Sequence, residues 1–287
     1  MDGDLGDFLR SRRARIRPED VGLPSYGRRR VPGLRREEVA QLAGVSVDYY
    51  IRLEQGRGPG GPSRTKSGGV SDAVLDSIAR VLQLDATEQA YLRTVARPPK
   101  KERDGRRRST RPGIRAGVQR LLDSMDRTPA FVLGPAMEAL AWNELGDALH
   151  GFSRLPPDRR NIVRHLFLEP EGRDLYPDWN AVAAQCVATL RLSAGTHADH
   201  RELRDLVGEL SLKSEDFRRL WADHQVRACM YGTKRVRHPV AGLLTLPYES
   251  LTLPETPEQT LVVYTPEPGS ETAERLALLG SWAGTSA

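Results

Sequence analysis

The stretch REEVAQLAGVSVDYYIRLEQGR, residues 36–57, decides the fold of the first part of the chain. Gly44 favours the left-handed backbone conformation that ends a helix, and Ser46 is a residue that caps the start of the next one. The segment therefore predicts two short helices joined by a tight turn. Apolar residues recur at helical spacing on both sides of this turn, at Val39, Leu42, Ala43, Tyr50 and Leu53.

Two short helices joined in this way form a helix-turn-helix, and the charge of the surrounding chain supports an anionic partner. Residues 1–111 carry 24 Lys and Arg against 15 Asp and Glu, whereas the remainder carries 19 against 23. The basic part is the part expected to meet nucleic acid. A basic helical surface that only keeps the protein soluble is the alternative, so the charge alone supports DNA binding weakly.

We expect a multidomain chain with a helical N-terminal unit. Amphipathic helices are predicted at residues 5–16, 71–82 and 87–96, which with the central motif make an all-α DNA-binding domain of residues 1–96. Residues 57–69 are rich in Gly, Pro and Ser and predict a surface loop. Residues 97–113 predict a basic linker.

The second domain, residues 114–287, is expected to be α+β with a small antiparallel sheet. The predicted strands cover residues 130–133, 138–142, 233–238, 243–253 and 260–264. The predicted helices cover residues 114–125, 159–168, 179–192, 202–210, 215–224 and 273–279.

Residues 36–57 resemble the helix-turn-helix of Xre-type repressors, and nearly the whole chain resembles the MmyB-like regulators of the actinobacterial type. The resemblance implies a sequence-specific, DNA-binding transcription regulator with a C-terminal, PAS-like ligand-binding domain. It also implies a fatty-acyl-like ligand, and an ion pair between Arg13 and Glu54 that joins the first and third helices. The further segments that carry the resemblance include VGLPSYGRRRVPGLRREEVA (21–40), AWNELGDALHG (141–151), GTKRVRHPVAGLLTLPYESL (232–251) and QTLVVYTPEPGS (259–270).

Base recognition requires side chains at the start of the second helix of the motif, because that end reaches the major groove. Arg52 is expected to contact guanine and Asp48 cytosine; the alternatives are an exposed Arg52 and an Asp48 that only favours the helix N-terminus. Phosphate contacts are expected from Arg36 and Arg57. Arg28, Arg29 and Arg30 either reach the DNA backbone or only hydrate their loop. The predicted base-reading set is Ser46, Val47, Asp48, Tyr49 and Arg52.

A ligand cavity in the C-terminal domain would be lined by aromatic side chains, although ordinary core packing explains any one of them. Lys234 and Arg237, near Arg235 and His238, could hold a ligand carboxylate; an exposed basic edge strand that deters aggregation is equally compatible with these residues. Asn143 resembles the polar residue that follows the second strand in PAS-like folds. The aromatic candidates are Trp142, Phe152, Phe167, Tyr176, Trp179, Trp221 and Tyr231.

Catalysis, cofactors and metal binding find no support in the sequence, which carries no P-loop, no G-x-S-x-G and no Cys-His signature. His197 and His200 lack a second cluster of ligands. No run approaches the about 18 apolar residues of a membrane span, so a cytoplasmic, nucleoid-associated protein is expected.

We therefore predict a regulator that is not an enzyme and that binds a palindromic operator as a homodimer, with a fatty-acid-like molecule as effector. The alternative is a C-terminal domain that only dimerises or binds a protein partner.

Overall fold

The computed structural model describes residues 2–24, 31, 33–56, 70–97 and 113–285. The chain divides into two compact units, each of which is described by itself. The unit built mainly from residues 1–102 is helical in its N-terminal part, as predicted. Its elements are α1 (Asp2–Arg15), a 3-10 turn (Pro18–Val21), α2 (Arg36–Ala43), α3 (Val47–Glu54), α4 (Asp72–Val81) and α5 (Ala86–Ala96).

The predicted boundaries of the DNA-binding domain and the linker stay predictions. The loop at 57–69 and residues 98–112 of the linker lie outside the described residues.

The core of the helical unit forms where α1 packs against its neighbours. Phe8 is buried and meets the ring of Tyr91 on α5 edge-on, with 5.1 Å between the ring centroids. The Arg12 guanidinium carbon lies 4.5 Å from the centre of the Phe8 ring, and Arg12 Nε lies 2.7 Å from the Glu88 carboxylate. Burial, partly offset by Glu88, lowers the pKa of Arg12 to about 10. The aromatic contact and the ion pair together join α1 to α5.

The C-terminal unit is built on one five-stranded antiparallel sheet with the order β2-β1-β5-β4-β3, so the predicted α+β class is confirmed. The strands are β1 (Ala130–Leu133), β2 (Ala139–Trp142), β3 (Tyr231–His238), β4 (Gly242–Leu253) and β5 (Thr256–Tyr264). The helices are α6 (Ala116–Asp123), α7 (Glu144–His150), α8 (Ile162–Leu168), α9 (Pro170–Asp174), α10 (Trp179–Thr196), α11 (Arg201–Lys213), α12 (Glu215–Ala222) and α13 (Glu271–Thr285). Two 3-10 turns cover Phe152–Arg154 and Pro157–Arg159.

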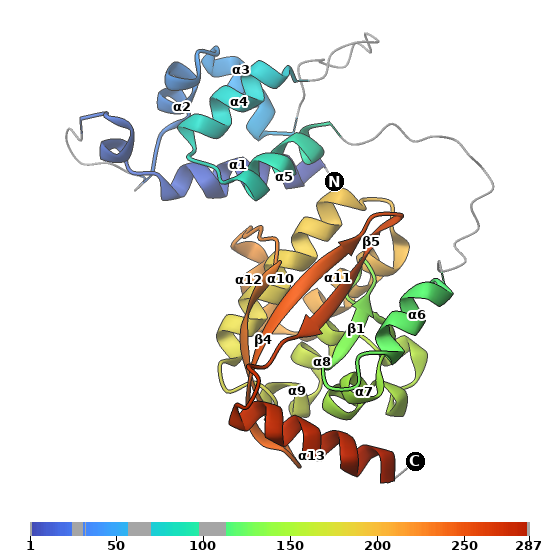
Figure 1. Ribbon diagram of the computed structural model, residues 1–287. Helices are drawn as coiled ribbons and strands as arrows, with labels where there is room; N and C mark the ends of the chain where they lie inside the picture. The colour runs from blue at the N-terminus through green and yellow to red at the C-terminus, as the bar shows by residue number, and fades with distance from the viewer. Residues whose placement is uncertain (1, 25–30, 32, 57–69, 98–112, 286–287) are drawn as a thin grey trace. The chain divides into compact units, whose positions relative to one another are not determined.

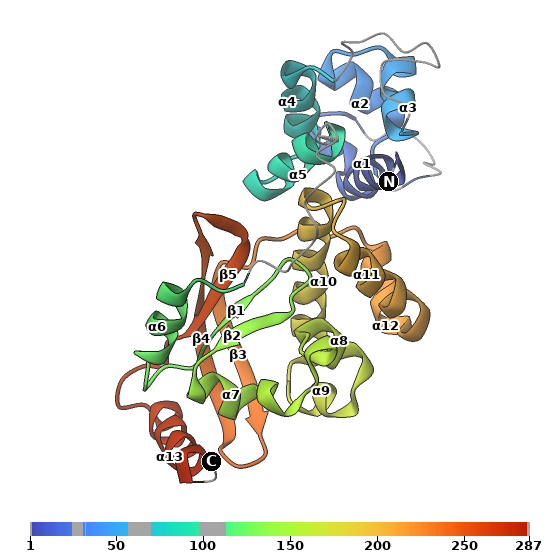
Figure 2. The ribbon, with the colours of Figure 1, turned by 90° about the vertical axis from the view of Figure 1, so that its right-hand side faces the viewer.

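Helices lie on both faces of the sheet (Figures 1 and 2). The face that meets α7, α8 and α10 is called the inner face. Here Phe131 of β1 contacts His150 of α7, with ring centroids 5.1 Å apart. On the opposite, outer face, α6 packs its buried Val118 and Leu122 against β1, β2 and β5. Figure 2 shows α13 on the same side of the sheet as α6.

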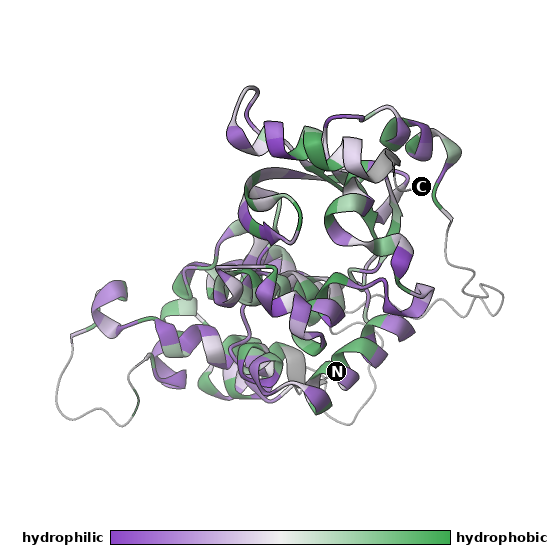
Figure 3. Cartoon of the chain, turned by 90° about the horizontal axis from the view of Figure 1, so that it is seen from below, coloured by the Kyte–Doolittle hydropathy of each residue, from purple (hydrophilic) through white to green (hydrophobic). Residues whose placement is uncertain are grey.

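Side-chain alternation assigns each residue of β3 and β4 to one of these faces. Lys234 pairs with Leu246 and Gly232 with Tyr248, so these side chains share the inner face. Arg237 pairs with Leu243, and this pair belongs to the outer face. The helices carry both hydrophilic and hydrophobic residues along their length (Figure 3), as expected of helices that bury one side. A sheet with one face buried fixes the register of β3 and hence the position of Lys234.

Candidate functional site

The turn between α2 and α3 forms as its sequence predicts. Gly44 ends α2 in the left-handed conformation, with φ +69°, and its N–H donates to the carbonyls of Ala40 and Gln41. Ser46 caps α3, its hydroxyl accepting a hydrogen bond from the backbone N–H of Tyr49 at 3.2 Å. At the start of α2, the backbone N–H of Arg35 donates to the Glu38 carboxylate at 2.7 Å. These local contacts set the angle at which α3 leaves the turn.

The predicted base-reading residues form one accessible surface at the start of α3. Ser46, Val47, Asp48 and Arg52 are exposed, and Tyr49 is half-buried. The Arg52 side chain lies along the helix, where its Nε donates to the backbone carbonyl of Asp48 at 3.2 Å. None of these five residues is buried, so the surface is available for a groove of DNA.

At the other end of α3, three arginines converge on one buried carboxylate. Glu54 accepts from Arg13 Nη2 at 2.8 Å and from Arg36 Nε at 3.2 Å, and Arg10 Nε lies 3.7 Å away. The ion pair that the sequence implied between Arg13 and Glu54 is confirmed. Arg10 also pairs with Asp7 at 3.0 Å, so three guanidinium groups face two carboxylates and this cluster keeps a positive charge. Arg36, predicted to contact phosphate, keeps 40% of its side chain exposed beside this cluster.

Four other predicted phosphate contacts cannot be placed in the same way. Arg28, Arg29, Arg30 and Arg57 lie outside the described residues.

The inner face of the C-terminal sheet carries a cluster of polar side chains around Lys234. The Lys234 amine lies 4.8 Å from the centre of the Tyr248 ring. The Tyr248 hydroxyl accepts a hydrogen bond from Gln185 Nε2 of α10 at 2.8 Å and lies 2.9 Å from Cys229 Sγ. Lys234 also interacts electrostatically with Tyr264 on the next strand but one. The cluster thus joins the edge of the sheet to the long helix α10.

The Lys234 ammonium has no acidic partner within the described residues. Lys234 is half-buried as a whole residue, but its amine lies in the packed interior. Burial lowers the pKa of Lys234, and the neighbouring phenols and thiols more than offset this, so that the pKa is raised and the amine is charged at neutral pH. A charged amine of this kind is a suitable partner for an anionic ligand group.

A small cavity of about 20 Å³ lies beside this cluster and is lined in part by His150, Phe152 and Tyr176. The Nε2 of His150 is 3.4 Å from the Tyr264 hydroxyl. Burial, with a smaller contribution from the charge of Lys234, lowers the pKa of His150 to about 3. Burial likewise raises the pKa of Tyr176. The cavity is about the size of one water molecule, so a larger ligand has to displace side chains.

Comparison with protein families assigns both units. Residues 4–92 match a helix-turn-helix domain, and residues 114–279 match the MmyB-like transcription regulator ligand binding domain. The chain belongs to the MmyB-like transcription regulators. This is a family of DNA-binding regulators and not of enzymes. The comparison with curated proteins gave no significant match. Within the described ranges, no helix of the MmyB-like chain is long and apolar enough to cross a membrane.

The ligand-binding domain of this MmyB-like regulator brings only some of the predicted ligand residues together. Phe152 and Tyr176 line the small cavity, and Trp142 contacts Phe152 with ring centroids 5.2 Å apart. Tyr231 is 76% exposed, and Arg237 is exposed on the outer face, away from Lys234. We therefore do not include these last two in the proposed ligand site.

A second aromatic group packs between the helices of the MmyB-like domain. Phe167 contacts Trp179 and Phe217 edge-on, at 5.6 and 5.4 Å between centroids. Trp221 stacks on Phe217 and lies 3.9 Å from the Arg191 guanidinium. These contacts favour a packing role for the predicted residues Phe167 and Trp221.

Asn143 of the MmyB-like chain connects backbone segments. Its side-chain oxygen accepts from the N–H groups of Ala130 and Gly146, at 2.9 and 2.8 Å, and its amide donates to the carbonyls of Met125 and Thr128. With its oxygen and amide both engaged, Asn143 holds the start of α7 against β1.

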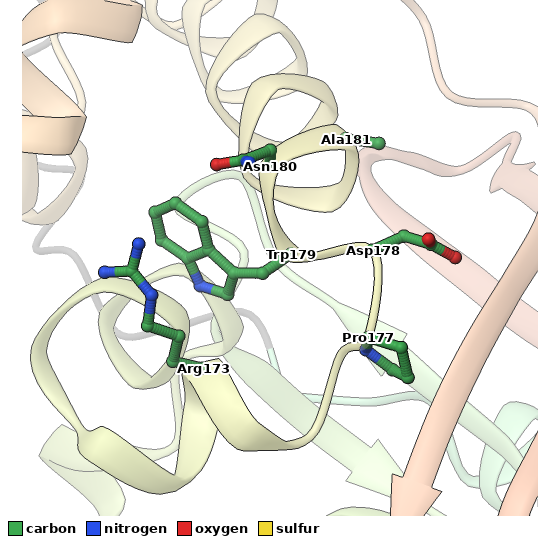
Figure 4. Close-up of a pocket in the computed structure, with 6 residues that line it drawn as sticks. All are labelled: Arg173, Pro177, Asp178, Trp179, Asn180 and Ala181. Carbon is green, nitrogen blue, oxygen red and sulfur yellow. The ribbon is translucent and has the colours of Figure 1, made fainter.

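Trp179 borders an open pocket of about 350 Å³ at the N-terminus of α10 (Figure 4). The Arg173 guanidinium lies 4.2 Å from the centre of the Trp179 ring. Asp178 lies on the other side of the pocket. Its two carboxylate oxygens accept hydrogen bonds from Nε and Nη2 of Arg235, each at 2.6 Å. This ion pair occupies Arg235, whereas its neighbour Lys234 points to the inner face of the sheet.

Sequence reasoning missed Tyr248, Gln185, Cys229, His150 and Tyr264. Strand alternation could have placed Tyr248 on the same face as Lys234, but the contacts with helices α7 and α10 have no local signal. His200, considered above as a metal ligand, caps α11 by accepting from the N–H of Leu203 at 3.3 Å. The described part of the MmyB-like chain holds no group of three potential metal ligands.

Proposed function

We propose that this regulator binds a palindromic operator as a homodimer in the cytoplasm, at the nucleoid, and that a small amphipathic carboxylate, of the fatty-acid kind, controls its DNA affinity. The proposal for the ligand rests on one observation, the enclosed Lys234 ammonium that has no acidic partner among the described residues. A carboxylate is the simplest ligand group that would neutralise it.

For DNA, the proposal assigns base reading to the exposed start of α3 and phosphate binding to Arg36. Arg52 is the donor best suited to guanine, because its guanidinium is exposed one turn into the helix. Two recognition helices about 34 Å apart in a two-fold dimer would read two half-sites. Ligand binding alters affinity only if it favours one arrangement of these helices over another.

The apolar part of the ligand would occupy the region of the small cavity between the sheet and α7 to α9. Ligand pockets commonly measure about 300–1,000 Å³, far more than the present cavity. The side chains of Phe152 and Tyr176 would therefore move on binding. Such a change next to α7 gives the ligand a means of altering the shape of the domain.

Binding is tested with a series of saturated fatty acids by native mass spectrometry and by titration of the full chain. The informative variant is Lys234→Met, which keeps an unbranched side chain, one atom shorter, and removes its charge; Lys213→Met, at an exposed lysine of α11, is the matched control. We expect at least about a tenfold loss of affinity for Lys234→Met, the effect of about 1.4 kcal/mol, and none for Lys213→Met. Equal affinity in both variants would contradict the assignment of Lys234.

The alternative function is a C-terminal domain that dimerises or binds a protein without a ligand. The small volume of the cavity favours it. If no fatty acid binds the wild-type chain, this alternative replaces the ligand proposal.

A further inference from the structure

Both cysteines of the chain belong to the polar cluster around Lys234. Cys186 lies on α10 and is 3% exposed, whereas Cys229 lies just before β3 and is half-buried. Both are free thiols, and the sequence contains no other cysteine. The two thiols interact electrostatically with each other, and each interacts with the Lys234 amine. The fold therefore brings the whole thiol content of the chain to one place, beside a cation.

Hydrogen bonds connect the two cysteine positions through Tyr248. The Cys229 Sγ lies 2.9 Å from the Tyr248 hydroxyl, and that hydroxyl accepts from Gln185 Nε2 at 2.8 Å. The phenolic O–H is thus available to donate to the sulfur. Gln185 is the neighbour of Cys186 in α10. The segment before β3 and the middle of α10 are therefore held together here by hydrogen bonds, at the two points where the chain carries a thiol.

The surroundings of the two thiols differ and assign them different roles. Cys229 is partly accessible and lies near a cation and a hydrogen-bond donor, the setting in which thiols react with oxidants. Cys186 is enclosed. Burial raises the pKa of the Cys186 thiol, and the charge of Lys234 offsets this only in part. Cys186 is therefore suited to react second, with a sulfur that is already oxidised and presented to it.

We propose that Cys229 and Cys186 form a reversible disulfide when the protein meets a peroxide. The Cys229 sulfur attacks one peroxide oxygen, so that the O–O bond breaks and an S–O bond forms. Cys229 becomes a sulfenic acid, and the other oxygen takes the thiol proton and leaves as water or an alcohol. The Cys186 thiol then displaces the hydroxyl group as water, and the S–S bond forms. Two electrons pass from the thiols to the peroxide, and a thiol reductant reverses the change.

The disulfide would link α10 covalently to the start of β3, beside the amine proposed to hold the ligand carboxylate. Cys186 also interacts with Tyr176, one of the cavity side chains that has to move when the ligand enters. A covalent link at Cys186 restricts this movement, so oxidation should weaken fatty-acid binding. This effect on the ligand rests on the proposed function, whereas the disulfide itself does not.

Mass spectrometry of the full chain treated with hydrogen peroxide tests the disulfide. The wild type should lose the mass of two hydrogen atoms and become resistant to thiol alkylation, and dithiothreitol should reverse both changes. Digestion without reduction should release two peptides joined through Cys186 and Cys229, which needs no variant. Cys186→Ser should stop at a sulfenic acid on Cys229, which dimedone captures, and Cys229→Ser should not react under the same conditions.

Two lysine variants test the role given to the cation. Lys234→Met should slow the oxidation of Cys229 at least about fivefold, while Lys213→Met, at an exposed lysine of α11, should react like the wild type. Circular dichroism checks that each variant is folded. Equal rates in Lys234→Met and Lys213→Met would remove Lys234 from the reaction.

The effect on the ligand site is measured separately. The oxidised wild type should bind a fatty acid at least about tenfold more weakly than the reduced wild type. A wild-type chain that keeps two free thiols, stops at an oxidised Cys229 or forms only disulfides between chains would overturn the proposal. Unchanged fatty-acid affinity in a chain that does form the disulfide would overturn its effect on the site. A disulfide in a chain that binds no fatty acid even when reduced would support the proposal and contradict the proposed function.

Discussion

Replacing Glu54 by Gln should destabilise the helical unit while leaving the sheet domain unchanged. The Glu54 side chain is fully buried, and the Arg13 side chain that it pairs with is only 12% exposed. Glutamine keeps an acceptor but removes the charge that pairs with Arg13 and Arg36. Breaking a buried pair by removing one partner costs about 3–5 kcal/mol. A cost near 3 kcal/mol would lower the Tm of a unit of this size by roughly 12–24 °C.

The distribution of tryptophan makes this measurement specific. All four tryptophans, at positions 142, 179, 221 and 282, lie in the C-terminal half. Tryptophan fluorescence therefore reports the sheet domain, whereas circular dichroism at 222 nm reports both. In Glu54→Gln, part of the dichroism should be lost at lower temperature while the fluorescence transition stays in place. Glu37→Gln, at an exposed position on α2, is the control. Equal unfolding of Glu54→Gln and Glu37→Gln would refute the role given to the cluster.

Three further predictions concern DNA and pH. Arg52→Ala should change sequence preference at one operator position, by about 1–3 kcal/mol, while Arg36→Ala should weaken all sequences alike; selection from random DNA that returns the wild-type motif for Arg52→Ala would contradict this. Operator affinity should fall with salt, by about one unit of log–log slope for each phosphate contact, and a flat salt dependence would count against these contacts. Acid should destabilise the sheet domain, because burial lowers the pKa of His150 and His238 below the ordinary value of 6.5. The unfolded state then binds protons first, so the free energy of unfolding is constant above about pH 6.5 and falls below it by up to about 1.4 kcal/mol per pH unit for each histidine. Urea midpoints that are the same at pH 7 and pH 5 would disprove it.

Much of the helix-turn-helix was predictable because its signals are local. Gly44 and Ser46 act on the backbone within a few residues of themselves, so the ends of α2 and α3 follow from their chemistry. The strands were predictable for a related reason, since β-branched and aromatic residues separated by turn residues need no distant partner to be recognised.

The interior of the ligand-binding domain was less predictable, because its contacts are long-range. Tyr248 and Gln185 are 63 positions apart, and Tyr264 and His150 are 114 apart. Only the sheet order, which places β1 beside β5, brings such residues together. Lys234 and Arg237 are both basic and lie only three residues apart on β3. The structure nevertheless places their side chains on opposite faces of the sheet.

Operator affinity measured with and without fatty acid tests the central claim most directly. Wild type, Lys234→Met and the control Lys213→Met are titrated with operator DNA at one salt concentration, each in the absence and presence of the fatty acid that binds the wild type best. We expect the acid to change the affinity of wild type and Lys213→Met at least about fivefold, a coupling of about 1 kcal/mol, and to leave Lys234→Met unchanged. A fatty acid that binds the wild-type chain yet leaves its operator affinity the same would contradict the account.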